Sequence, residues 1–177
     1  MDKIDIFTLS AESNLDRDAF ISKYITNNTV NIEFSYLSDF KNAKILRDIV
    51  SIIGRHIWLS RVVISRLTLI VDEMNNNAIE HGSNQWDVNK IRFMCEPKEG
   101  GLFVCIEVED SGKWWTAKKA LDMETLRAHQ LRLGYKWHNS IRWRWLFMII
   151  VNLVDRVYFK DSKNGGLIVW IKNKYEL

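Results

Sequence analysis

The sequence predicts an α+β protein: a two-layer α/β sandwich in which helices cover one face of a mixed, mostly antiparallel sheet. Several short segments alternate apolar and polar residues, which is typical of strands with one buried face. Two longer segments repeat apolar residues every three or four positions, which is typical of helices packed on a core. A chain of 177 residues is long enough for one such sandwich with a single core.

The first half of this sandwich is expected to hold one strand and two helices. Residues 31–37 (NIEFSYL) alternate as a strand does. Ser38 is expected to cap a helix that ends at Gly54. A second helix is expected over about residues 60–81. Its predicted core stripe consists of Val63, Leu67, Ile70, Met74 and Ala78.

The second half is expected to be mainly strands. Residues 91–96 (IRFMCE) and 102–108 (LFVCIEV) flank the turn PKEGG, which predicts a β-hairpin. Residues 111–140 are expected to be irregular, apart from a short helix in ALDMETLRAHQL. A helix is expected from near Arg142. The last two predicted strands are RVYFK (156–160) and LIVWIK (167–172).

The chain divides into an N-terminal extension, residues 1–30, and a domain over residues 31–177. In the extension, AFISKYI (19–25) predicts a short helix, which docks either on the sheet or on a second subunit. A secretion signal is not expected, and the longest apolar run, residues 145–151, is too short to span a bilayer. We therefore expect a cytoplasmic protein without a membrane partner.

The composition is that of a soluble globular protein, with 47% hydrophobic and 27% charged residues. The two cysteines, Cys95 and Cys105, lack metal-site spacing and are expected to be buried thiols. The net charge is +3, but residues 113–144 hold eight Lys/Arg against Asp122 and Glu124. This basic, aromatic segment fits either a phosphate-bearing partner or a solvated lysine-rich loop.

The strongest chemical signal is DEMNNNAIEHG (72–82), at the end of the second predicted helix. Three successive asparagines do not favour a helix, so another reason for them is expected. Glu73 and Asn77 are four residues apart and share one helix face. A carboxylate and a carboxamide there suit Mg²⁺ binding and orientation of a nucleophile in phosphoryl transfer. A solvated polar face is the alternative.

With three further segments, this motif resembles the GHKL ATPases, and most of all the anti-sigma-factor serine kinases among them. The segments are VEDSG (108–112), LVDRVYF (153–159) and GGLIVWI (165–171), and the resemblance spans residues 31–177. It implies the following roles: Glu73 as catalytic base, Asn77 as Mg²⁺ ligand, Asp110 as acceptor of the adenine amino group, Gly112 in the turn that follows, and Gly166 in the last glycine motif.

The chain departs from the family at the phosphate-binding glycines. Where the family has D-x-G-x-G, this chain places Trp114 at the second glycine. Where the family has G-x-G-L, it reads Trp143-Arg144-Trp145-Leu. Glycine lets backbone N–H groups approach a phosphate, and an indole fills that space. The substitutions fit either a natural pseudoenzyme or a deliberate block of the site.

The resemblance implies a serine kinase that binds ATP and Mg²⁺, phosphorylates an antagonist protein and so regulates a partner-switching pathway. Lys113, Lys118 and Arg144 would then offset phosphate charge. The alternative is a catalytically inactive module that binds a sigma factor or an antagonist, with indoles in the nucleotide site. A homodimer fits either function. Nucleic acid binding by residues 113–144 has only charge and aromatic residues in its support, so it is not the expected partner.

Overall fold

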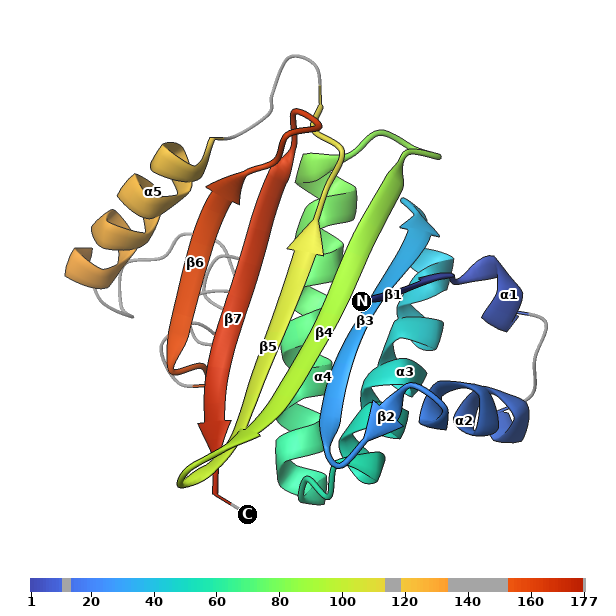
Figure 1. Ribbon diagram of the computed structural model, residues 1–177. Helices are drawn as coiled ribbons and strands as arrows, with labels where there is room; N and C mark the ends of the chain where they lie inside the picture. Colours follow the sequence, from blue (N-terminus) through green and yellow to red (C-terminus); the bar gives the residue numbers. More distant parts are fainter. Residues whose placement is uncertain (11–13, 114–118, 134–152, 177) are drawn as a thin grey trace.

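The computed structural model describes the chain except for residues 11–13, 114–118, 134–152 and 177. A seven-stranded sheet has the order β1-β3-β4-β5-β7-β6, and the short β2 pairs with β3. Helices α3 and α4 lie on one face of the sheet, and no described helix crosses the other face in Figure 1. This arrangement confirms the predicted two-layer α+β sandwich.

The strands are antiparallel to their neighbours, except that β1 runs parallel to β3. The predicted strand at 31–37, the hairpin and the two C-terminal strands are confirmed. The strands are β1 (Asp2–Asp5), β2 (Ile25–Thr26), β3 (Thr29–Leu37), β4 (Val88–Lys98), β5 (Gly101–Glu109), β6 (Arg156–Asp161) and β7 (Leu167–Tyr175). The β4–β5 turn passes through Gly100 and Gly101, with φ of 79° and 144°, conformations that glycine adopts without steric cost.

Both predicted ends of the first long helix, α3 (Ala43–His56), were wrong. Asp39 rather than Ser38 caps its start: the Asp39 carboxylate accepts the Lys41 N–H at 2.9 Å and opens a 3-10 turn that runs into α3. Gly54 lies inside the helix, not at its end. A methyl group there would lie 2.7 Å from Cγ1 of Ile64 in α4, so this glycine permits close helix packing.

The second predicted helix is confirmed as α4 (Arg61–Asn77), extended by a π-helical turn, Ala78–Gly82. Ser60 caps it, because its hydroxyl accepts the Val63 N–H at 3.3 Å. The expected stripe faces the sheet. Leu67, Ile70, Met74 and Ala78 are buried, and Val63 packs partly buried against the same core.

The described N-terminal residues, 1–10 and 14–30, pack into the same core as the rest of the domain. They form β1, α1 (Phe7–Ser10), α2 (Asn14–Ser22) and β2. Arg17 of α2 binds Asp48 of α3 at 2.7 Å, and Asp18 lies 2.8 Å from His56 of the same helix. The helix expected over residues 19–25 is therefore α2, which begins earlier and ends at Ser22. It docks on α3 of its own chain, not on the sheet, and its Ile21 is fully buried.

The predicted short helix after residue 111 is confirmed as α5 (Ala120–Leu133), beside β6. The helix expected from Arg142 lies outside the described residues. None of the described helices is long and apolar enough to cross a membrane.

Candidate functional site

The end of α4 holds the two residues of the asparagine-rich motif. The Asn77 side-chain amide donates a hydrogen bond to Oε1 of Glu73 at 3.2 Å, and both side chains are half-buried. Their shared helix face is thus as the four-residue spacing requires. Because the amide nitrogen of Asn77 is turned to Glu73, its oxygen is the atom left to serve a cation, and oxygen is the donor that Mg²⁺ prefers.

Asp110 follows the last residue of β5 and is 8% exposed. Its Oδ1 accepts the backbone N–H groups of Gly112 and Leu167, each at 3.0 Å. Burial raises the pKa of its carboxyl to about 6; these two hydrogen bonds act in the opposite direction, and the charge of Glu109 raises the pKa further. One carboxylate oxygen is thus held by the fold at the end of a central strand.

Three glycines pack against Asp110 and its turn. A methyl group at Gly82 would overlap the Asp110 carboxylate, and one at Gly166 would overlap its backbone carbonyl. Gly112 has a φ of +80°, and a methyl group there would lie 2.6 Å from the carbonyl oxygen of Gly165. These positions require glycine for close approach, which brings the ends of α4, β5 and the β6–β7 turn together.

The motif on α4 and Asp110 belong to one region of the molecule. Gly82, which touches Asp110, is five residues beyond Asn77 on a continuous helical path. Five helical residues rise about 7–8 Å. Along this path, Asn77 is about one and a half turns of helix, and Glu73 about two and a half turns, from the glycine that touches the Asp110 carboxylate.

Buried polar atoms without partners surround this region, and sequence reasoning missed them. Tyr36 and Asn89 are register partners on β3 and β4, and both face the helix layer. Asp110 continues the same row across β5, next to Asn89. The buried atoms without a hydrogen-bond partner in the described structure are Tyr36 Oη, Ser38 Oγ, Asn89 Nδ2, and both Asn75 Nδ2 and Oδ1.

This buried row indicates a place for polar ligand atoms or water. Nearly all buried polar groups in folded proteins have partners, so such a concentration calls for one. Burial, with the nearby Asp110 charge as the second cause, raises the pKa of Tyr36, so its hydroxyl stays protonated. The available signal was a polar residue at an inward position of an alternating strand, which both Tyr36 and Asn89 occupy.

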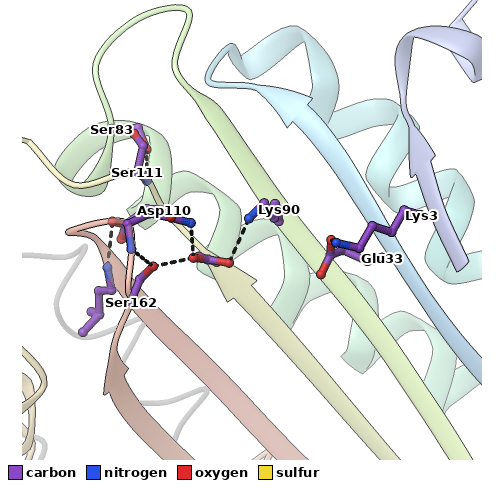
Figure 2. A network of polar contacts seen from close by, with 10 residues as sticks. Lys3, Glu33, Ser83, Lys90, Asp110, Ser111 and Ser162 are labelled. Atoms are coloured by element: carbon purple, nitrogen blue, oxygen red, sulfur yellow. Dashed lines mark hydrogen bonds and ion pairs between the residues drawn. The ribbon is translucent and has the colours of Figure 1, made fainter. Parts of the chain in front are cut away.

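A hydrogen-bonded network fixes the loops around Asp110 (Figure 2). Ser83 donates to Asn89 and accepts the Ser111 N–H at 3.3 Å. On the other side of the strand, Glu109 accepts from Ser162 and from Lys90, the latter at 3.3 Å. These hydrogen bonds connect the loops around the end of β5 to the neighbouring strands.

The predicted phosphate-side residues are described only in part. Lys113 donates a hydrogen bond from its ammonium group to the Glu80 carbonyl oxygen at the end of the α4 path. Trp114, Lys118 and the segment Trp143-Arg144-Trp145 lie outside the described residues. The described residues contain no cluster of three or more His, Cys, Asp or Glu side chains able to hold a metal.

The groups around Asp110 are of the kinds that contact a nucleotide base. A buried carboxylate with one oxygen already bonded, a glycine against the other and polar atoms without partners nearby can take an amino-bearing planar ring. A search of curated proteins gives no match. The sequence model described as Histidine kinase-like ATPase domain matches residues 38–172, and a domain of this kind implies ATP as its ligand. The chain belongs to the histidine kinase-like ATPase domain family.

Proposed function

We propose that this domain binds ATP with Mg²⁺ and acts as a serine kinase of the anti-sigma-factor type, with an antagonist protein as phosphate acceptor. The observation that carries this proposal is Asp110, a buried carboxyl at a strand end whose Oδ1 is held by two N–H groups. Such a carboxylate can accept the adenine amino group through Oδ2, beside which Gly82 carries no side chain. The paired Glu73 and Asn77 supply the second part of the site.

Each residue then has a defined task. ATP, when bound, supplies the phosphoryl group that is transferred. Glu73 accepts the proton of the attacking serine hydroxyl, and its hydrogen bond from Asn77 holds the carboxylate in position. The Asn77 amide oxygen would be the Mg²⁺ ligand from α4. Asp110 accepts a hydrogen bond from the adenine amino group, while Lys113 and Arg144 would offset phosphate charge.

The alternative is an inactive binding module for a sigma factor or an antagonist. It is favoured by a specific observation, the tryptophans at positions 114, 143 and 145, where the family has phosphate-binding glycines. Large indoles at these positions would occupy the space of the phosphates. The two proposals agree on the fold and differ on whether MgATP binds.

Melting temperatures with and without MgATP separate the two functions. At a ligand concentration about a hundredfold above Kd, a protein that binds the ligand only when folded gains about 2.7 kcal/mol in its free energy of unfolding. We expect this gain in the parent chain, and we expect it to vanish in Asp110→Ala. A gain seen only after Trp114, Trp143 and Trp145 are all returned to glycine would establish the inactive module. No gain in either protein would contradict both functions.

Catalysis needs a separate measurement, because binding alone does not establish a kinase. Glu73→Gln should bind MgATP within about twofold of the parent, yet the formation of ADP should fall by about 100-fold or more, the usual range for a lost general base. The matched control is Asp72→Asn on the same helix, since Asp72 pairs with Arg47 at 3.1 Å. Equal loss of turnover in both variants would contradict the role of Glu73.

A further inference from the structure

The outer face of the sheet is the one opposite α3 and α4 in Figure 1. It carries a groove whose lining shares no residue with the nucleotide region. The groove has a volume of about 540 Å³ and is lined by residues of β3, β4, β5 and β7. Its lining includes Phe103, Trp170 and Lys172. It also includes two carboxylates, Glu96 and Glu107, which are paired with Lys98 and Arg92. A volume of this size accommodates a nucleotide or a few side chains.

Most charges on this face are paired across strands, but those at one end of β7 are not. Lys3 pairs with Glu33 at 3.5 Å, and Arg92 pairs with Glu107 at 3.7 Å. Within the described part of the chain, by contrast, no carboxylate oxygen lies within 4.0 Å of the ammonium groups of Lys172 or Lys174. The outer face thus has a local excess of positive charge on β7.

These lysines converge on one aromatic ring. The Nζ atoms of Lys172, Lys174 and Lys98 lie 5.0, 5.8 and 5.8 Å from the centroid of the Phe103 ring. Lys98 also binds Glu96 at 2.9 Å, so it is the one partly neutralised member. Three ammonium groups around one ring, only one of which has a carboxylate partner, favour a ligand with several negative charges.

A flat aromatic wall borders the same groove. The rings of Trp170 and Tyr158 are stacked, with centroids 4.0 Å apart and an interplanar angle of 15°. Tyr158 belongs to β6, which contributes no lining residue, whereas Trp170 lines the groove. Tyr158 therefore backs one face of the indole, and the other side of the indole is turned to the groove.

We propose that this groove binds single-stranded nucleic acid, with a base stacked on Trp170 and the adjoining phosphates on Lys172 and Lys174. Every base offers a π-face to an aromatic wall, and the strand supplies phosphates at regular spacing to the cations. An acidic peptide would match the lysines but has no planar group to match the indole wall. The surface is distinct from residues 113–144, and it does not depend on nucleotide binding at Asp110.

The test is the binding of a fluorescein-labelled polyuridine of ~12 nucleotides, a length within the usual site size, followed by anisotropy over a range of salt. The parent should bind with an affinity that falls as salt rises. In Lys172→Ala/Lys174→Ala the slope of log K against log salt should shrink by about 1.4, or about 0.7 for each phosphate contact removed. The matched control, Lys41→Ala/Lys44→Ala, removes the same charge from exposed lysines at the start of α3 and should leave the slope unchanged.

A second pair of variants tests the aromatic wall. Trp170→Leu should weaken binding about tenfold or more, whereas Trp170→Phe keeps a π-face and should retain most of the affinity. Unchanged melting temperatures in the lysine variants establish that the fold is intact. The proposal is overturned if the parent does not bind the oligonucleotide, or if Lys172→Ala/Lys174→Ala binds as the parent does. It is also overturned if polyglutamate or uridine monophosphate binds as tightly as the oligonucleotide, which would indicate an acidic protein or a small ligand instead.

Discussion

Both faces of the sheet carry polar side chains, but the two faces differ in how these side chains find hydrogen-bond or ion-pair partners. On the inner face the polar residues are few and buried, and those with atoms that lack partners in the described structure include Tyr36 and Asn89, at the end of the sheet near Asp110. Asn173, near the other end, is hydrogen-bonded. On the outer face the charges are numerous, and pairs such as Arg92–Glu107 neutralise most of them across strands. The groups without partners thus indicate one ligand position on each face. On the inner face it is the row of buried polar residues beside Asp110, and on the outer face it is Lys172 and Lys174 of β7.

The largest expected effect concerns the packing that brings the β6–β7 turn onto Asp110. Gly166→Ala places a methyl group into the Asp110 backbone, and we expect a loss of about 3 kcal/mol or more in the free energy of unfolding. Gly165→Ala is the matched control, because a methyl there meets nothing within 4 Å and only the φ of +93° is unfavourable. It should cost about 1–2 kcal/mol. Urea denaturation measures both, and equal losses would contradict the close approach.

The second effect is a pH dependence of stability. The native Asp110 carboxyl has its pKa raised from 3.8 to about 6, so between these values the folded state holds more protons than the unfolded state. Stability from this group therefore falls as pH rises from about 4 to about 6 and is constant above, a change of about 3 kcal/mol.

Asp110→Asn removes that contribution. The difference in unfolding free energy between parent and variant should drift by a few kcal/mol over this range, measured by urea denaturation at each pH. A difference that stays constant with pH would show that Asp110 is not a buried carboxyl with a raised pKa.

The third effect concerns Asn75, which is fully buried on α4 and has neither side-chain atom bonded within the described structure. Asn75→Leu replaces unsatisfied polar atoms by an apolar group of similar size and should raise the free energy of unfolding by about 1–3 kcal/mol. Asn76→Leu, at a half-buried neighbouring position, is the control and should gain less. A destabilised Asn75→Leu would mean that ordered water satisfies the amide.

The smallest effect is expected on the outer face. The Arg92 and Glu107 side chains are 30% and 27% exposed and lie 3.7 Å apart. A double-mutant cycle to alanine should give a coupling below about 1 kcal/mol that decreases with added salt. A larger, salt-independent coupling would remove the contrast between the two faces.

Local patterns predicted much of this molecule, and the misses have a common cause. Helix α4 follows from its 3.6-residue stripe, and the Glu73–Asn77 contact follows from four-residue spacing. The place of Gly54 inside α3 depends on Ile64 of another helix. The row formed by Tyr36, Asn89 and Asp110 depends on the register of three strands. Alternation can show that Tyr36 and Asn89 point inward, but interactions between distant segments leave no local periodicity, so the pattern could not predict which residues become neighbours.

The N-terminal segment illustrates the same limit. The parallel pairing of β1 with β3 sets Asp2 opposite Ile32, thirty positions away. A strand of four residues carries too little alternation to indicate its partner. Residues 1–30 therefore looked separable in sequence, although Ile4 and Ile21 are buried in the shared core.

The central claim is that the Asp110 carboxylate receives the adenine amino group. Its most direct test is calorimetric titration with MgATP, on the parent and on Asp110→Asn, across about pH 5 to 8. The parent should lose affinity as pH falls through about 6, where the carboxyl takes up a proton, by up to about tenfold per pH unit. Asp110→Asn should bind about 10- to 100-fold more weakly above that pH, because a charged acceptor is lost, and it should lack this pH dependence. Titration of the ATP phosphates affects both proteins alike. Equal affinities and equal pH profiles in the two proteins would contradict the claim.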